Sequence, residues 1–95
     1  MSKQFRIGEF AYTPGAEKAL EASGQLPTDF LERHLVGDWG DVSTEEWSRN
    51  NKHLETGGRL HSVYKTLCGE VLWMITEADR SKTTLTLPDE FLPAH

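Results

Sequence analysis

The chain has 95 residues, 37% of them hydrophobic, and a formal net charge of −5 at pH 7. This length suffices for one modest core, so residues 1–95 are interpreted as a single small domain. The acidic charge disfavours direct binding to nucleic acid or to an anionic membrane surface, because both need a basic footprint.

The sequence also bears on where the protein works. No apolar run reaches the roughly 18 residues that a membrane-spanning helix needs, and no signal-peptide-like segment opens the chain. The single cysteine, Cys68, has no partner for an internal disulfide. We therefore expect a cytoplasmic protein with no membrane association.

The N-terminal quarter predicts a strand and then a helix. Weak alternation over residues 5–10 favours an edge strand or an ordered arm. Thr13 supplies an N-cap hydroxyl and Pro14 suits the first helical position, so the Ala-rich run that follows is predicted to be helical. Gly24 is a natural C-cap for this helix.

Two further helices are predicted before the middle of the chain. Pro27 repeats the start signal, and this second helix should end at Gly37. Ser43 followed by Glu46 forms a capping box for a third helix, which should end at Gly57. Since both glycines close a helical run, we expect positive φ at Gly37 and Gly57.

The remainder of the chain alternates with a period of two residues. Residues 59–65, 70–76 and 83–87 are predicted to be strands joined by short turns, which implies an antiparallel meander. The middle strand is apolar on both faces, so it should be central. We expect four side chains of the last two strands to lie deep in the core: Trp73, Ile75, Leu85 and Leu87.

These patterns together predict the fold class. We expect an α+β domain in which two to three short N-terminal helices pack on a C-terminal three-stranded antiparallel meander. An extra N-terminal edge strand is compatible with this arrangement. No internal repeat, linker or low-complexity tract divides the chain.

The net charge is concentrated in residues 29–46, which we call the acidic segment. It has one basic residue, Arg33, and six acidic ones: Asp29, Glu32, Asp38, Asp41, Glu45 and Glu46. Outside this segment, acids and bases balance. Six carboxylates in eighteen residues could meet a basic groove that normally holds phosphate.

The acidic segment contains an unusual stretch, "RHLVGDWGDV", residues 33–42. We interpret it as a structured loop in which Trp39 packs inward, while Asp38 and Asp41 turn towards backbone amides or solvent. The alternative is a binding face for a partner protein. Its residues would be Asp38, Trp39, Asp41, Glu45 and Glu46.

No metal or cofactor is expected. His34 and Asp38 are four residues apart, but Gly37 interrupts the helix between them, and no spacing resembles a zinc site or a calcium loop. No phosphate loop, dinucleotide fingerprint or nucleophile elbow occurs either.

Catalysis is a second alternative. Metal-independent ribonucleases use an acid or base beside the 2′-hydroxyl and cationic groups beside the phosphate. The residue types that fit are His34, Arg59, His61, Tyr64 and Arg80. Arg59 and His61 point to one face of their predicted strand and Tyr64 to the other, so these residues cannot all share one site.

Three stretches of residues 30–91 carry a resemblance. "RHLVGDWGDV", "GGRLHSVY" and "LWMITEADRSKTTLTLP" resemble a group of small bacterial proteins of uncharacterised function that plasmids, prophages and other integrated elements encode. This resemblance implies a mobile-element setting. A looser similarity, in the order of helices and strands, is to toxin domains of the barnase–EndoU–colicin–RelE type.

Two functional hypotheses follow. The first is a mobile-element accessory protein that acts as a non-enzymatic acidic interaction module and interferes with a host nucleic-acid-handling defence complex. The alternative is a small ribonuclease-like toxin domain or its inactive relative. The first needs exposed, clustered acids, whereas the second needs His34 or His61 within about 4–6 Å of Arg59 or Arg80 at a cleft.

Overall fold

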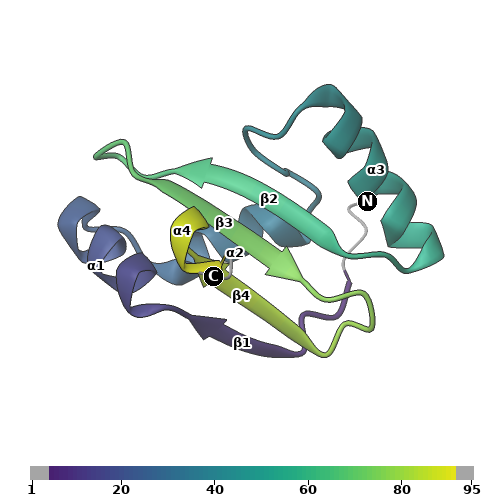
Figure 1. Cartoon of the computed structure of the whole chain (residues 1–95), viewed down its shortest axis with the longest axis horizontal. Coiled ribbons are helices and arrows are strands. Elements are labelled where there is room, and N and C mark those ends of the chain that lie inside the picture. Colours follow the sequence, from purple (N-terminus) through teal and green to yellow (C-terminus); the bar gives the residue numbers. More distant parts are fainter. Residues whose placement is uncertain (1–4, 92–95) are drawn as a thin grey trace.

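The computed structural model of the chain describes residues 5–91, which form four helices and four strands (Figure 1). In chain order these are β1 (Glu9–Tyr12), α1 (Pro14–Ser23), α2 (Pro27–Leu35), α3 (Thr44–Thr56), β2 (Leu60–Lys65), β3 (Val71–Thr76), β4 (Lys82–Thr86) and α4 (Pro88–Phe91). The strands form one sheet in the order β1-β4-β3-β2. The α+β class is therefore confirmed.

The sheet differs from the expected three-stranded antiparallel meander. β2, β3 and β4 pair antiparallel in sequence order, but β1 adds a fourth strand that runs parallel to β4. In this pairing Glu9 lies opposite Lys82 and Tyr12 lies opposite Leu85. The sheet is therefore mixed. A parallel pair joins segments far apart in the chain, so no local turn signal reveals it.

The helices are also not all N-terminal. Pro88 ends β4, as expected, and then starts α4, a single helical turn. In Figure 1, α4 lies in front of the sheet and α2 lies behind it. Within residues 5–91, no helix is long and apolar enough to cross a membrane.

The helix boundaries follow local capping chemistry. The Thr13 side chain caps α1, and the Ser43 hydroxyl accepts a hydrogen bond from the Glu46 amide at 3.1 Å. Gly37 and Gly57 have φ of 82° and 88°. These predictions are confirmed, and they fix where the acidic segment leaves one helix and enters the next.

The core lies between the sheet and the first two helices. Tyr64, Leu72, Met74 and Leu85 project from one sheet face, because alternate residues of a strand share a face. Against them pack four side chains of α1 and α2: Ala16, Ala19, Leu20 and Phe30. Burial of each large apolar side chain contributes roughly 1.5–3 kcal/mol.

The expectation for Trp73 was wrong. β3 directs Leu72 and Met74 into the core, so Trp73 lies on the opposite face, where it is half-buried. There it contacts Phe91 of α4, with 6.0 Å between ring centroids. Ile75, on the same face as Trp73, is buried as predicted.

Candidate functional site

The stretch Asp38–Asp41 lies along the outer edge of β2 and closes it. The Asp41 amide donates to the Val63 carbonyl at 2.7 Å, and the Val63 amide donates to the Trp39 carbonyl at 3.0 Å. Between them the backbone of Gly40 approaches so closely that a Cβ would lie 2.0 Å from the Val63 oxygen. Its φ of 76° also favours glycine. The loop thus occupies backbone groups that would otherwise invite edge-to-edge association.

The Asn50 side chain of α3 closes the neighbouring part of the β2 edge. Its amide nitrogen donates to the His61 carbonyl at 2.8 Å, and its amide oxygen accepts from the His61 amide at 3.2 Å. The side chain therefore imitates an adjacent strand and holds α3 against β2. A polar residue on the buried stripe of a helix was the only signal for this role in the sequence.

Trp39 anchors the loop from inside. It is 0% exposed, and its indole N–H donates to the Asn51 side chain at 3.0 Å. Its ring packs edge-on against His34 and stacks on Phe5, at centroid distances of 5.3 and 6.3 Å. Trp39 therefore packs inward as expected, and it supports the predicted partner-binding face from below without contributing contact surface to it.

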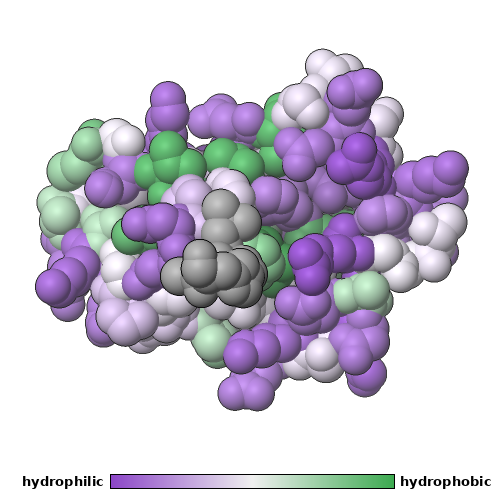
Figure 2. Space-filling view, in the orientation of Figure 1, coloured by the Kyte–Doolittle hydropathy of each residue, from purple (hydrophilic) through white to green (hydrophobic). Residues whose placement is uncertain are grey.

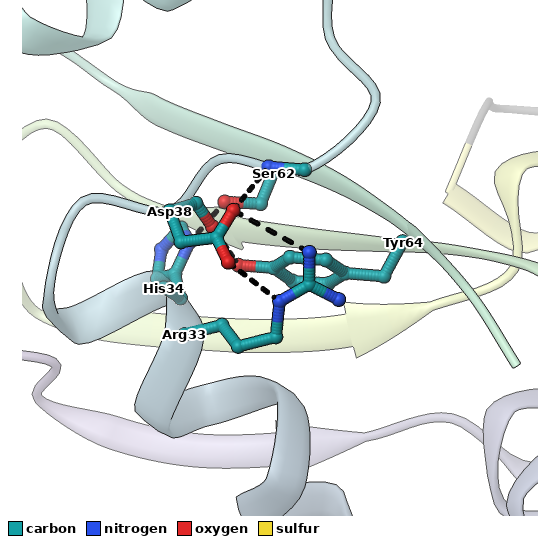
Figure 3. Close-up of polar contacts among 6 residues, drawn as sticks. Arg33, His34, Asp38, Ser62 and Tyr64 are labelled. Carbon is teal, nitrogen blue, oxygen red and sulfur yellow. Dashed lines mark hydrogen bonds and ion pairs between the residues drawn. The ribbon is translucent and has the colours of Figure 1, made fainter.

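Asp38 is held by a cation that we did not anticipate. Arg33 Nε donates to its carboxylate at 2.8 Å, and the guanidinium lies over the Tyr64 ring, 4.5 Å from the centroid (Figure 3). The hydrogen bond with Arg33 lowers the pKa of Asp38, and the Gly40 amide also donates to this carboxylate at 3.2 Å. Both side chains of the pair are 43% exposed, so it contributes at most about 1 kcal/mol.

His34 is the centre of a buried polar network. Its Nδ1 lies 2.5 Å from the Ser62 hydroxyl and its Nε2 lies 2.9 Å from the Thr76 hydroxyl, which in turn contacts Thr83. Burial lowers the pKa of His34 to about 3, so the ring is neutral. A serine beside a histidine is an arrangement that activates nucleophiles. Here the histidine and the serine are fully buried, so no substrate reaches them.

Tyr64 and Arg80 are likewise held by the fold. The Tyr64 hydroxyl donates to the Asp38 carbonyl at 2.7 Å, and burial raises its pKa. Arg80 donates to the carbonyls of Gly58 and His53 at 2.7 and 2.9 Å. Arg80 therefore joins the β3–β4 turn to the end of α3, and both side chains act as structural ties.

Of the five residues considered for catalysis, Arg59 and His61 are the pair that lines a common cleft, between α3 and β2. The other lining residues come from α3: Glu46, Arg49, Asn50 and His53. His61 Nδ1 lies 3.6 Å from the Glu46 carboxylate, and burial lowers the pKa of His61. We call this hollow the α3–β2 cleft. Sequence reasoning missed Arg49 and His53, although their helical spacing places them on one face.

The acidic segment keeps only part of its charge available. Asp29 accepts from a backbone amide at the start of α2, Asp38 pairs with its arginine, and Glu46 turns towards the α3–β2 cleft. Asp41 and Glu45, by contrast, are exposed, and neither side chain makes an ion pair with another residue in 5–91. Of the residues predicted to bind a partner, Asp41 and Glu45 are therefore the two whose carboxylates are exposed and make no ion pair within residues 5–91.

An open groove of about 390 Å³ is lined by residues next to Asp41 and Glu45 in the sequence. We call it the Trp47 groove, and its lining residues are Gly40, Val42, Ser43, Thr44, Trp47 and Ser48. Trp47 is 37% exposed to solvent, which is a large exposure for so large an apolar side chain. The acidic pair Glu45 and Glu46 directly before it was the signal for a surface role.

Two surfaces thus remain as candidates, the Trp47 groove and the α3–β2 cleft. Among residues 5–91, no group of three or more His, Cys, Asp or Glu side chains is placed to hold a metal ion. Comparisons with protein-family models, with curated proteins and with solved structures find no match for this chain.

Proposed function

We propose that this chain is a non-enzymatic interaction module that binds an arginine-rich protein surface through the Trp47 groove. The observation that carries the proposal is the exposed Trp47 indole in a groove whose lining residues adjoin Asp41 and Glu45 in the sequence. These two exposed acids lack ion-pair partners among the described residues. A host complex that handles nucleic acid presents a basic surface of this kind. The acidic segment would compete there with phosphate.

The chemistry of the groove suits arginine better than lysine. A planar guanidinium can stack on the Trp47 ring while its N–H groups donate to a carboxylate, so one side chain satisfies both features. Charge-assisted hydrogen bonds of this type are about twice as strong as neutral ones. Asp41 and Glu45 are next to lining residues of the groove in the sequence and would supply the acceptors.

The fold presents this groove in a fixed shape. The two backbone bonds to Val63 hold the loop that forms one wall, and the Ser43 cap fixes the start of α3, which forms the other. A preformed surface loses little conformational entropy when a partner binds. This rigidity supports a docking role and explains why so much of the "GDWGD" stretch is committed to structure.

The proposal is tested with an immobilised hexa-arginine peptide. Removing the two charges with Asp41→Asn and Glu45→Gln, or removing the indole with Trp47→Ala, should weaken binding by about tenfold or more, which corresponds to 1.4 kcal/mol. The matched control removes two exposed acids of α1, Glu17→Gln and Glu21→Gln. It should leave the affinity nearly unchanged.

Two results would contradict the proposal. One is that the α1 control weakens peptide binding equally, which would show that binding depends only on the net charge of the protein. The other is unchanged binding when the groove residues are replaced. Hexalysine should bind more weakly than hexa-arginine, because a primary ammonium neither stacks nor forms a bidentate pair. Capture from a bacterial lysate with the same variants would then identify the partner.

A further inference from the structure

The α3–β2 cleft collects polar side chains from two elements by simple periodicity. Positions 46, 49, 50 and 53 recur every three or four residues and so share one face of α3. Arg59 lies just before β2, and His61 two residues further on projects to the same sheet face. Packing α3 along β2 brings these two sets together around a volume of about 180 Å³. A water molecule occupies about 30 Å³, so the cleft has room for a small ion.

The cationic groups of this cleft exceed its acidic ones. Arg49 has no ion-pair partner among residues 5–91, whereas Arg59 pairs with Glu77 at 3.5 Å and lies over the Phe91 ring, 5.8 Å from its centroid. The one carboxylate in the lining, that of Glu46, lies on the His61 side. Two arginines therefore line a space whose single acid is already engaged. Such an arrangement favours an anion with several oxygens.

The orientation of the His53 ring also favours an anion in the cleft. Its Nδ1 lies 2.8 Å from the Arg59 carbonyl, which only accepts, so Nδ1 must carry a hydrogen. The ring is pressed against Gly58, where a Cβ would lie 2.4 Å from it. Nδ1 is thus engaged and Nε2 is left as the ring nitrogen for the cleft. When the ring is protonated, Nε2 donates as well.

We infer that the α3–β2 cleft binds a phosphate group, held between Arg49 and Arg59, with the Nε2 of the protonated His53 ring as a third donor. This site is separate from the Trp47 groove and does not depend on the function proposed for it. Figure 2 views the molecule from the α4 side and shows hydrophilic residues gathered over α3. The phosphate could be free or part of an ester, and the overall negative charge of the protein argues that binding is local rather than a general affinity for polyanions.

The test is a titration followed by NMR signals of the histidine rings. Inorganic phosphate, at constant ionic strength set with chloride, should shift the ring signals of His53 and His61 in a saturable way. Arg49→Gln combined with Arg59→Gln should raise the dissociation constant at least tenfold. Both arginines are exposed, so the variant should fold. The matched control, Lys52→Gln, removes a charge from α3 outside the cleft and should bind as the unaltered chain does.

The source of the phosphate is settled by two further ligands. Adenosine 5′-monophosphate carries a monoester and the dinucleotide ApA carries a diester. Saturable binding of either that requires the two arginines supports the site, and the tighter one names the ester. Shifts that never saturate, or that persist in the double variant, would show an adventitious ion only and overturn the inference.

Discussion

Acid should destabilise this protein through His34, whose buried ring must become charged when the chain unfolds. The pKa of His34 is about 3 in the folded state, because burial penalises the charged ring, against 6.5 in an unfolded chain. The unfolded state therefore binds more protons below pH 6.5, and stability falls as the pH falls from 6.5 towards 3. Between pH 7.5 and 5.0 this amounts to about 2 kcal/mol, since each pH unit below 6.5 contributes about 1.4 kcal/mol.

The assay is urea denaturation at pH 7.5 and 5.0 on the unaltered chain and on His34→Gln. The variant loses hydrogen bonds to Ser62 and Thr76, so its stability is lower at both pH values, but the difference between them should shrink by about 2 kcal/mol. Burial also lowers the pKa of His61, which destabilises the folded chain in acid in the same direction. The variant His61→Gln therefore measures the part of the pH dependence that does not come from His34. The pKa of Asp38 is lowered, so this group changes the stability only at pH values below the range of the assay. If the free energy of unfolding falls equally between pH 7.5 and 5.0 in the unaltered chain and in His34→Gln, the reasoning is refuted.

Three further predictions concern the loop and the sheet. Gly40→Ala should cost about 2–5 kcal/mol, from left-handed strain and overlap with the strand carbonyl, whereas Gly57→Ala, which meets no atom within 4 Å, should cost only about 1–2 kcal/mol. Urea denaturation compares the two, and similar costs would remove the close-approach argument. Trp39→Ala should cost about 3–5 kcal/mol and the half-buried Trp73→Ala clearly less, a ranking that thermal denaturation checks. Asn50→Ala should cost about 1–3 kcal/mol and speed hydrogen exchange of the β2 amide that it caps, while unchanged exchange would disprove that role.

The sequence predicted well the structural features that depend on interactions between neighbouring residues. The Ser43 cap and the positive φ at Gly37 and Gly57 depend on contacts within a few residues, and all three are confirmed. The inward packing of Trp39 followed from its size, because so much apolar surface is costly to leave in water. For the cap and the two glycines, the deciding interactions lie within a few residues, whereas the partners of Trp39 are distant in sequence.

Contacts between distant segments were not predictable in this way. The parallel pairing of β1 with β4 joins residues more than seventy positions apart. Trp73 and its neighbours are apolar on both sides, so periodicity could not tell which face meets the main core. The hydrogen bonds of His34 to Ser62 and Thr76 likewise require three elements to come together.

The candidate site likewise combines local features that the sequence indicates with contacts between segments that it does not. The interaction hypothesis requires exposed acids; Asp41 and Glu45 are exposed, whereas Asp38 and Glu46 are partly buried and paired. The pairing of Asp38 with Arg33 crosses the end of α2 and needed the helix end to be placed first. The cleft that contains Arg59, His61 and residues of α3 could not be predicted before the packing of α3 on β2 was known. Asn50 holds these two elements together, but its role was hard to recognise from the sequence.

The most direct test of the docking proposal is an NMR titration of the three indole N–H signals with hexa-arginine. The chain has three tryptophans in three environments: Trp39 is buried, Trp73 is half-buried under α4, and Trp47 lines the groove. We predict a saturable shift of the Trp47 signal that weakens as salt is added, with the other two nearly unmoved. A shift confined to Trp73, or no saturable shift of Trp47, would contradict the assignment of this groove as the docking surface.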